Sequence, residues 1–377
     1  MEGITLYPLR NIHRKVFGVG IDKYFTPFLT ASHTHHFKNR EKKDVLPEKN
    51  SAFDDYRRQI VPQIMAANSE TFLWAAREMK KLGYEEINLN LGCPAPTVVN
   101  RHKGSGLLTE PEYLDRMLCE IYEGIAGRED YPAISLKTRL GFQDPEEAGR
   151  LMKIYASYPV KELIIHARVR EDYYRGNPRI DAFRSAVSAY RAAGGRADIC
   201  YNGNVSDTQS YNEILKAAGI LCDGKINIRN DTQKDTDKDT SKYTGKDTNI
   251  ADAYEDSCMP LTAGETDGPA NRRQTSEVTS IMIGRGLLYD PALVRKLKGG
   301  DALLAKELRT YLGELYEAYA EYIPEDRNVI FKMLEHWAYL HVHFKDCDRQ
   351  LKAIRKSRSR AEYHAAVNKI FAECEFI

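Results

Sequence analysis

The chain has 377 residues and a formal net charge of +1, and 42% of its residues are hydrophobic. This length predicts two domains, or a barrel with an appendage, and the apolar share is ample for a sizeable core. A near-zero net charge excludes a globally basic nucleic-acid binder, so contact with RNA would require local positive charge. No apolar run reaches the roughly 18 residues of a membrane span, and the first residues lack the pattern of a signal peptide, so we expect neither feature.

The expected elements alternate between short β-like runs and helical patterns up to about Pro291. Several of the β-like runs are continuously apolar, which is typical of parallel strands covered on both faces. Repeated strand–helix alternation predicts an α/β fold, here a TIM (β/α)8 barrel. The expected strands are 23–27, 61–66, 86–92, 133–140, 162–169, 198–202 and 280–284, and the expected helices are 69–82, with a cap at Ser69, then 110–123, 145–158, 180–193 and 208–218.

Only seven strands are visible, and the eighth would be the first strand of the barrel. The chain opens at Met1 with no β-like run ahead of it, so we expect a truncated first strand. Segment 223–277, between the last two strands, repeats Lys-Asp-Thr and is poor in apolar residues. It cannot bury enough surface to offset its chain entropy, so we expect it to be disordered.

From residue 301 the strands stop and helical patterns cover 302–322, 325–343, 347–357 and 360–374. Four helices of this length predict a small C-terminal all-helical domain. The domain boundaries that follow are a barrel over 1–298, containing the 223–277 insertion, and a helical domain over 299–377.

Cysteine usage predicts the cellular environment. The seven cysteines are scattered without a C-x-x-C pair. An odd count with this spacing argues against a disulfide framework or a zinc ribbon and predicts a reducing, cytoplasmic location. His33, His35 and His36 resemble a metal cluster, but the cations of Lys38–Lys43 beside them indicate a solvated basic loop, so we expect no metal site.

Polar residues gather where the expected strands end, which is where barrel enzymes place their active sites. Gly203, Gly284 and Gly286 would let backbone amides approach a phosphate, with Arg285 adding charge, although tight turns alone would also explain the glycines. The polar set at these ends is Gln63, Asn90, Cys93, Lys137, Arg139, His166, Arg168, Asn202, Gly203, Asn204, Gly284 and Arg285.

Three of these side chains carry the strongest chemical signal. Cys93 stands between Gly92 and Pro94 on a glycine-rich loop, where a thiol can exchange a proton with a substrate. A lone cysteine is more often a small buried hydrophobe. Lys137, within an apolar strand, is costly unless it has an anionic partner. His166 ends an apolar run at the expected barrel mouth, and a satisfied core histidine is its alternative.

With these motifs in place, the sequence resembles the tRNA-dihydrouridine synthase family. The most specific match is the run 87–96, Ile-Asn-Leu-Asn-Leu-Gly-Cys-Pro-Ala-Pro, which is similar to the family's signature around its catalytic cysteine. The match continues in order and spacing to about Pro291, apart from the insertion. Supporting runs are 62–65, 104–108, 137–141, 165–168, 174–176, 202–204 and 283–286.

The resemblance implies a flavin-dependent oxidoreductase acting on CH–CH bonds, with FMN reduced by NADPH. In such an enzyme a hydride passes from flavin N5 to C6 of a tRNA uridine, and Cys93 donates a proton to C5. The resemblance further implies flavin contacts by Gln63, Lys137 and His166, phosphate contacts by Asn202, Gly203, Asn204, Gly284 and Arg285, and substrate contacts by Asn90, Arg139, Arg101 and Lys103.

The expected partner is tRNA, bound by a monomer that does not contact a membrane. Beside Arg101 and Lys103, basic residues for a phosphate track cluster in the tail at Lys352, Arg355, Lys356, Arg358 and Arg360, although a charge run is usually only a solvated face. Two alternatives stay open: a flavin barrel dehydrogenase that acts on a free pyrimidine, and a non-catalytic tRNA-binding protein.

Overall fold

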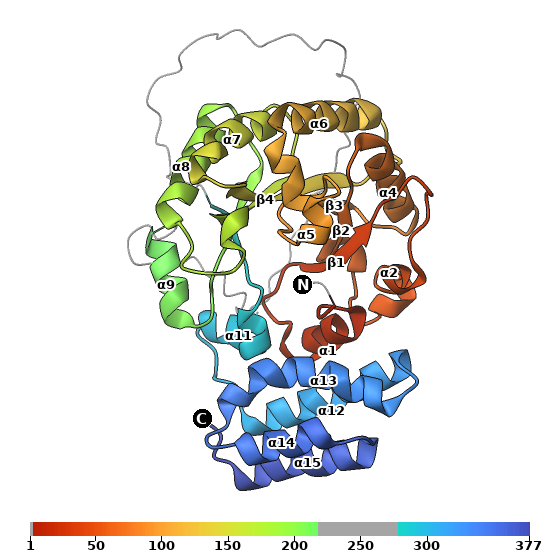
Figure 1. Ribbon diagram of the computed structural model, residues 1–377, viewed down its shortest axis with the longest axis vertical. Coiled ribbons are helices and arrows are strands. Elements are labelled where there is room, and N and C mark those ends of the chain that lie inside the picture. The colour runs from red at the N-terminus through yellow and green to blue at the C-terminus, as the bar shows by residue number, and fades with distance from the viewer. Residues whose placement is uncertain (1–2, 218–277) are drawn as a thin grey trace, which may run out of the picture. The chain divides into compact units, whose positions relative to one another are not determined.

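The computed structural model describes residues 3–217 and 278–377, which belong to one compact unit (Figure 1). Segment 223–277, which we expect to be disordered, lies outside the described residues. The boundary between residues 298 and 299 stays a prediction. No helix in the described part of the chain is both long and apolar enough to cross a lipid bilayer.

Seven parallel strands form one curled sheet in chain order, and this confirms the barrel architecture predicted from the sequence (Figure 1). Each predicted strand is present, with bounds that differ by a few residues at most. The strands are β1 (Tyr24–Thr30), β2 (Ile60–Met65), β3 (Glu86–Asn90), β4 (Ala133–Gly141), β5 (Glu162–Val169), β6 (Asp198–Asn202) and β7 (Ser280–Met282).

The two faces of the sheet differ in chemistry because side chains alternate along each strand. On β3, Ile87 and Leu89 belong to the main apolar core, which the surrounding helices cover. Glu86, Asn88 and Asn90, on the opposite face, point into the barrel and are all buried. The barrel interior is therefore polar, and its side chains need partners there.

An ionic cluster fills the interior at the N-terminal ends of the strands. Lys23 Nζ lies 2.9 Å from Glu86 and 3.2 Å from Glu162, and Lys161 Nζ lies 2.8 Å from Glu86. Ser280 Oγ donates to Glu162 at 3.1 Å. Because these charges neutralise one another, the open polar chemistry is confined to the other end of the barrel.

The outer edges of the sheet are β1 and β7, and among residues 3–217 no strand precedes β1. The expected remnant of a first strand is therefore not seen there, and residues 3–6 instead form a turn that leads into a helix. The N–H of Thr30 on β1 donates to Glu41 Oε2 at 3.4 Å, which gives one edge amide a partner.

The helices between the strands were predicted with small errors. The cap of α4 is Asn68 and not Ser69, because the Asn68 side chain accepts the N–H of Thr71 at 3.0 Å. The main helices are α4 (Ser69–Lys81), α6 (Pro111–Ile125), α7 (Ala148–Ala156), α8 (Ile180–Ala192) and α9 (Thr208–Ala217), with short helices α2 (Asn39–Lys43), α3 (Tyr56–Gln59), α5 (Pro96–Val99), α10 (Gly286–Tyr289) and α11 (Leu293–Leu297).

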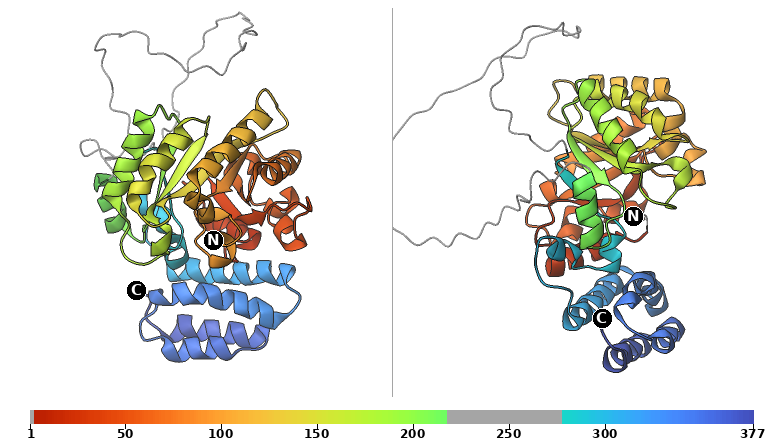
Figure 2. Two further views of the ribbon diagram at one scale, coloured as in Figure 1. Left: turned by 45° about the horizontal axis from the view of Figure 1, so that its top comes forward. Right: turned by 90° about the vertical axis from the view of Figure 1, so that its left-hand side faces the viewer.

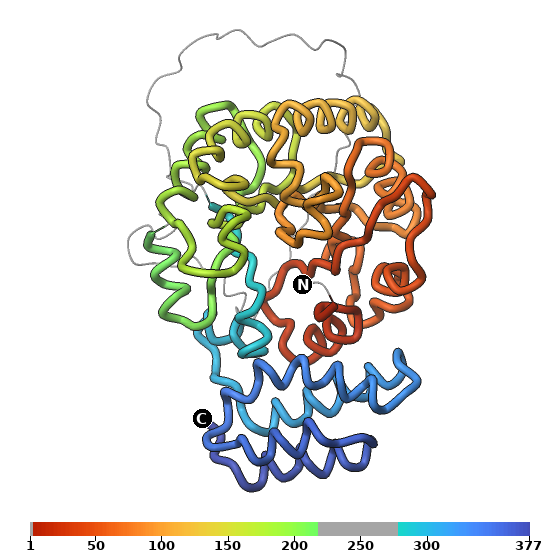
Figure 3. The backbone as a smooth tube through the Cα atoms, in the orientation of Figure 1, coloured from red at the N-terminus to blue at the C-terminus, as the bar shows by residue number. Residues whose placement is uncertain are grey.

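The C-terminal region is helical, as predicted, and its four helices gather into one bundle (Figure 2). The bundle consists of α12 (Ala305–Tyr322), α13 (Asp326–Leu340), α14 (Asp348–Lys356) and α15 (Arg360–Glu373). It shares a second apolar core with α1 (Tyr7–Phe17), a helix that the sequence analysis did not predict. In the trace of Figure 3, α1, near the N-terminus, runs beside α12 of the bundle.

Candidate active site

The strand register brings most of the predicted site residues to one rim of the barrel. Asn90 pairs with Lys137, Arg139 pairs with His166, and His166 pairs with Asn202 across neighbouring strands. Paired residues in a parallel sheet point to the same face, so these five side chains share the interior at the C-terminal ends of β3 to β6.

A chain of amide side chains fixes the β2 and β3 part of this rim. Gln63 Nε2 donates to Asn88 Oδ1 at 3.0 Å, and Asn90 Nδ2 donates to Gln63 Oε1 at 2.6 Å. Asn90 Oδ1 in turn accepts the N–H groups of Gly92 and Cys93 at 3.0 and 2.9 Å. The side-chain oxygen of Asn90 therefore forms its hydrogen bonds within the protein, and these bonds hold the peptide before Cys93 in place.

The Cys93 loop is also held from its far side. Ser105, which is fully buried, donates both its N–H and its hydroxyl to the Cys93 carbonyl, at 3.1 and 2.8 Å. Gly104 has a φ of +55°, and a Cβ there would lie 2.9 Å from the Cys93 carbonyl oxygen, so only glycine fits. Arg139 Nε donates to the Gly92 carbonyl at 2.7 Å.

Cys93 lies close enough to Lys137 and Arg139 for its charge to raise the pKa of both side chains. Burial is nevertheless the larger effect on Lys137, and together with the charge of Arg139 it lowers the Lys137 pKa to about 8. No hydrogen bond or ion pair reaches Lys137 from any residue that the structure describes. A buried ammonium without a partner can bind an anionic or electron-rich ligand.

The imidazole of His166 is surrounded by cationic side chains. Burial first, then the charges of Lys137 and Arg139, hold the pKa of His166 well below its ordinary value, so the imidazole is neutral near pH 7. Its ring contacts the ring of Tyr174, with the centroids 6.4 Å apart. Its nitrogens receive no hydrogen bond within residues 3–217 and 278–377, and they remain available to a ligand.

Beyond His166, the β5 to β7 side of the rim contains Arg168, whose Nε is buried without a partner among the described residues. The hydroxyl of Tyr201 is also buried without such a partner, but Tyr201 pairs with Ile165 and belongs to the apolar core on the other face of the sheet. Arg285 Nη2 donates to Asn204 Oδ1 at 3.2 Å. This side of the rim is cationic, and an unsatisfied buried donor such as Arg168 Nε suits a bound anion.

Tyr174 covers the rim, and the sequence analysis gave it no role. Its ring is 56% exposed and lies between the guanidinium groups of Arg139, at 5.7 Å, and Arg285, at 5.4 Å. Arg168 holds the segment beneath it by donating to the carbonyls of Arg175 and Gly176. The sequence analysis placed Arg168 at this strand end without a role, and its period-two spacing from His166 indicates that both face the barrel interior.

Two predicted substrate residues lie outside the rim. Arg101 is exposed on the loop that follows Cys93. Lys103 is partly buried, and its ammonium donates to the Ala31 carbonyl at 2.8 Å. Lys103 therefore ties the Cys93 loop to the segment after β1, and its contact with substrate stays a prediction.

The histidine loop forms no metal centre in the described part of the chain, where no group of three or more ligands is arranged for a metal ion. His33 and His35 instead approach Glu70, at 3.9 and 3.6 Å. The ring of His35 stacks on Trp74, with centroids 5.2 Å apart.

Comparison with known proteins agrees with this geometry. Residues 1–229, more than half of the chain, match the family model described as dihydrouridine synthase (Dus). The chain is 25% identical over 221 residues to tRNA-dihydrouridine synthase B of Pseudomonas syringae pv. tomato, covering 58% of this chain and 60% of that protein. It is 27% identical over 227 residues to a probable tRNA-dihydrouridine synthase of Staphylococcus epidermidis, covering 58% and 64% respectively.

A probable tRNA-dihydrouridine synthase of Rhodobacter capsulatus is 32% identical over 146 residues, which covers 38% of this chain and 42% of that protein. The chain thus aligns with less than two thirds of the length of these relatives. The matched residues 1–229 nevertheless contain the Cys93 loop and the rim as far as Asn204. The chain belongs to the dihydrouridine synthase family.

Proposed function

We propose that this protein reduces uridines in tRNA to 5,6-dihydrouridine, with FMN as its cofactor and NADPH as the reductant. The observation that carries the proposal is the convergence of Cys93, Lys137, Arg139 and His166 on one rim of the barrel. A thiol, a cation without a carboxylate and a neutral imidazole are the groups that a flavin-dependent reduction of a pyrimidine ring needs from its protein.

The residues present fit a flavin mononucleotide. The ring would meet Gln63, Lys137 and His166, two of which have no hydrogen-bond partner in the described residues. The phosphate would take the cationic side, where Arg168 Nε is unsatisfied and Arg285 adds charge. The backbone and side chains proposed to hold it are Asn202, Gly203, Asn204, Gly284 and Arg285.

When bound and reduced, FMN supplies the hydride, and the chain's own residues supply position and a proton. The Cys93 thiol donates a proton to C5 of uridine. The thiolate left behind lies next to the cationic Arg139 and to Lys137, which is largely protonated at pH 7 because its pKa is about 8. These charges stabilise the thiolate, so proton donation from the thiol becomes easier.

The substrate base must leave the folded RNA to reach this rim. We propose that Asn90 and Arg139 contact the uracil, with Arg101 and Lys103 near the adjoining backbone. Asn90 has Nδ2 beside the rim, and Arg139 Nη2 makes no hydrogen bond to the described residues, so each retains a donor suited to a uracil carbonyl oxygen. Exposed Tyr174 offers a flat ring at the entrance.

The test is to express the protein in cells that lack dihydrouridine and to map dihydrouridine in their tRNA. Wild-type protein is expected to restore it at defined positions, and Cys93→Ala is expected to lose most activity, by about a hundredfold or more, while it retains flavin. Cys119→Ala, on the outer helix α6, is the matched control and should behave as wild type.

Three outcomes separate this proposal from its alternatives. Turnover of free uracil without any reaction on tRNA would favour a free-pyrimidine dehydrogenase. A colourless purified protein that still binds tRNA would favour a non-catalytic binding protein. Unchanged activity in Cys93→Ala would remove the thiol from the mechanism.

A further inference from the structure

Tyr173, on the loop after β5, has a backbone conformation that disfavours its side chain. Its φ is +51° and its ψ is −100°, and the N–H of Arg175 donates to the Asp172 carbonyl at 2.8 Å. These values describe a type II′ β-turn over residues 172–175, with Tyr173 at the first central position. Glycine dominates that position because a Cβ is strained there, so a tyrosine persists only where its surroundings hold it.

Contacts on the turn supply that hold. Asp172, directly before the strained residue, accepts both Nη groups of Arg179, at 2.7 and 3.1 Å. The guanidinium of Arg170 lies 4.9 Å from the ring centroid of Tyr173 and 5.1 Å from that of Phe142. The strained conformation is therefore fixed both through its backbone neighbour and through its own ring.

The turn brings a backbone carbonyl to the barrel rim. The Tyr173 carbonyl accepts Arg139 Nη1 at 3.0 Å, and the Val169 carbonyl accepts the same nitrogen at 2.9 Å. Arg139 Nε donates to the Gly92 carbonyl at 2.7 Å. These bonds leave Nη2 as the nitrogen of Arg139 without a hydrogen bond to the described residues. The direction of that donor depends on the turn.

The same turn sets the place of Tyr174, which is its second central residue. The exposed ring of Tyr174 lies 5.7 Å from the guanidinium of Arg139 and 5.4 Å from that of Arg285. If Tyr173 relaxed to a negative φ, the peptide after it would rotate, and both the Tyr173 carbonyl and the Tyr174 ring would move. The strain at Tyr173 and the covered rim are therefore linked.

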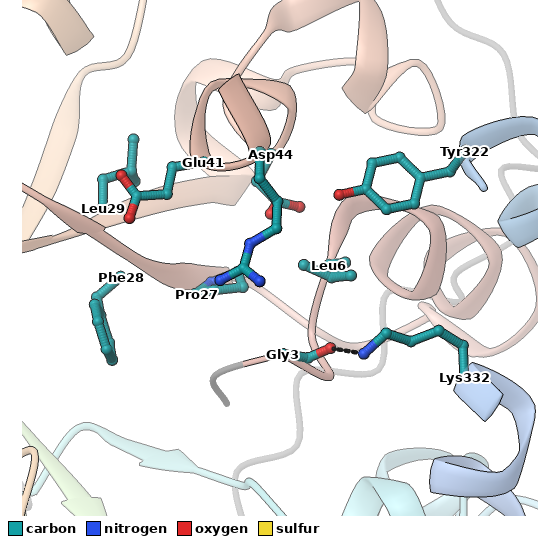
Figure 4. A pocket seen from close by; sticks show the side chains of 10 residues that line it. Gly3, Leu6, Pro27, Phe28, Leu29, Glu41, Asp44, Tyr322 and Lys332 are labelled. Carbon is teal, nitrogen blue, oxygen red and sulfur yellow. Dashed lines mark hydrogen bonds between the residues drawn. The ribbon is translucent and has the colours of Figure 1, made fainter. Parts of the chain in front are cut away.

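The donor left open under the turn contrasts with the polar lining of a cavity of about 80 Å³ between β1, α2 and the tail. Figure 4 shows the Lys332 ammonium at this cavity donating to the Gly3 carbonyl, at a distance of 3.0 Å. Asp44, on the opposite side, accepts the N–H of Tyr7 at 2.6 Å. These two groups have partners within the protein, whereas Arg139 Nη2 has none among the described residues.

We propose that Tyr173 is a positioning residue for Arg139: its strained turn aims Nη2 of the arginine and keeps Tyr174 over the rim. The inference rests on the proposed function in taking uracil as the group that Nη2 meets. A donor that is already fixed in direction needs no reordering when the substrate arrives. A displacement of about 1 Å is costly to a reaction that depends on alignment.

Two variants of this position separate the backbone from the ring. Tyr173→Gly and Tyr173→Val both remove the ring and its contact with Arg170, but only glycine adopts a positive φ without strain. Tyr173→Val is expected to lower kcat/KM for tRNA about tenfold relative to Tyr173→Gly. Reduction of the bound flavin by NADPH, a step that precedes the contact between Arg139 and uracil, is expected to be equally fast in both variants.

A second readout requires neither turnover nor RNA. Arg139 lies close enough to Cys93 for their charges to interact, so its guanidinium stabilises the thiolate. Displacing the guanidinium weakens this effect. The pH at which iodoacetamide modifies Cys93 at half its maximal rate is therefore expected to rise by about half a unit in Tyr173→Val relative to Tyr173→Gly. Mass spectrometry of the Cys93 peptide measures the rate, with Cys119 on α6 as the internal reference.

The matched control is another residue with a positive φ outside the rim. Asp346 also has a φ of +51° and is exposed in the tail, just before α14. Asp346→Val imposes the same kind of backbone conflict and is expected to leave both readouts unchanged. If Asp346→Val reproduces the effects of Tyr173→Val, they arise from general destabilisation, and the positioning role is overturned.

The two readouts also distinguish this inference from the proposed function. A raised alkylation midpoint in Tyr173→Val but not in Tyr173→Gly, with no dihydrouridine formed by any protein, would support the positioning role and overturn the function. Dihydrouridine formation by the wild type, with the two Tyr173 variants equal in both readouts, would overturn the positioning role and leave the function standing.

Discussion

At the scale of single residues, Lys137 combines burial with the absence of a described anionic partner. Its pKa of about 8 places its titration within reach of ordinary assays. Below pH 8 the ammonium is mostly protonated, and above it the amine is mostly neutral. Because an electron-rich ring or an anion prefers the protonated form, FMN affinity is expected to be constant below pH 8 and to fall above it, by up to about tenfold per pH unit.

Fluorescence quenching of FMN, titrated from pH 7 to pH 9, measures this dependence. Lys137→Arg keeps a charge that does not titrate in this range, so its affinity should vary little with pH even if it is weaker overall. A decline above pH 8 that is equally steep in Lys137→Arg would assign the titration to another group.

The chemistry of the rim residues could be read from the sequence, but their engagement with one another could not. The resemblance pointed to Asn90 and Arg139 as uracil contacts, yet most of their hydrogen bonds go to the protein: Asn90 to Gly92 and Cys93, and Arg139 to three backbone carbonyls. The Asn90 bonds are local, but those of Arg139 depend on where loops 30 or more residues away return in space, which no local pattern specifies. Arg168 and Tyr174 went unassigned for the same reason.

At the scale of elements, Ser105 holds the Cys93 loop in place through two hydrogen bonds to the Cys93 carbonyl. Removing the Ser105 hydroxyl deletes one of two hydrogen bonds to the Cys93 carbonyl and leaves the N–H bond in place. A lost hydrogen bond of this kind corresponds to about 1 kcal/mol. Ser105→Ala is therefore expected to change the alkylation rate of Cys93 and to lower kcat roughly fivefold, with flavin content and KM nearly unchanged.

Thr109→Ala is the matched control for Ser105→Ala. Thr109 donates its hydroxyl to the Gly106 carbonyl at 2.8 Å in the same short helix, Gly104–Thr109, without touching Cys93. If Ser105→Ala lowered activity only by loosening this helix, Thr109→Ala would lower it by a similar factor. Equal effects at Ser105 and Thr109 would contradict a specific role for Ser105 in positioning the thiol.

The strands were predictable because their apolar runs are local, and their bounds shifted little. Helix α1 could not be predicted in the same way, because its basic residues Arg10, Arg14 and Lys15 make Tyr7–Phe17 resemble a polar loop. Its helix is stabilised by contacts that are remote in sequence. Leu9 and Phe17 join the core of the tail, and Lys15 pairs with Glu314 at 2.9 Å. Tertiary packing of this kind overrides local propensity.

At the scale of the whole molecule, two buried histidines stand out: His13, between the barrel and the tail, and His336, inside the tail. His13 on α1 contacts the Tyr24 hydroxyl at 2.8 Å and the Pro291 carbonyl at 3.0 Å, and it lies against Tyr311 of α12. His336 on α13 contacts the Tyr319 hydroxyl at 3.0 Å. Burial is the main cause that lowers the pKa of each histidine to about 4. Both are therefore neutral in the folded protein near pH 7.

These values predict that the protein loses stability in mild acid. An unfolded histidine binds a proton below about pH 6.5, whereas the folded His13 and His336 do so only near pH 4. Between these two pH values the unfolded state binds more protons, so the free energy of unfolding falls as pH falls. Each histidine is expected to contribute a loss of about 3 kcal/mol across this window, as an upper estimate.

Urea unfolding at several pH values between 7 and 4 measures the effect. His13→Gln with His336→Gln should be less stable than wild type at pH 7, since buried partners lose their hydrogen bonds, but its stability should depend less on pH. His33→Gln, at an exposed position, is the control and should keep the wild-type dependence. If the double variant loses stability between pH 6.5 and 4 as steeply as wild type, the acid sensitivity arises from other groups, because the two histidines no longer titrate in it.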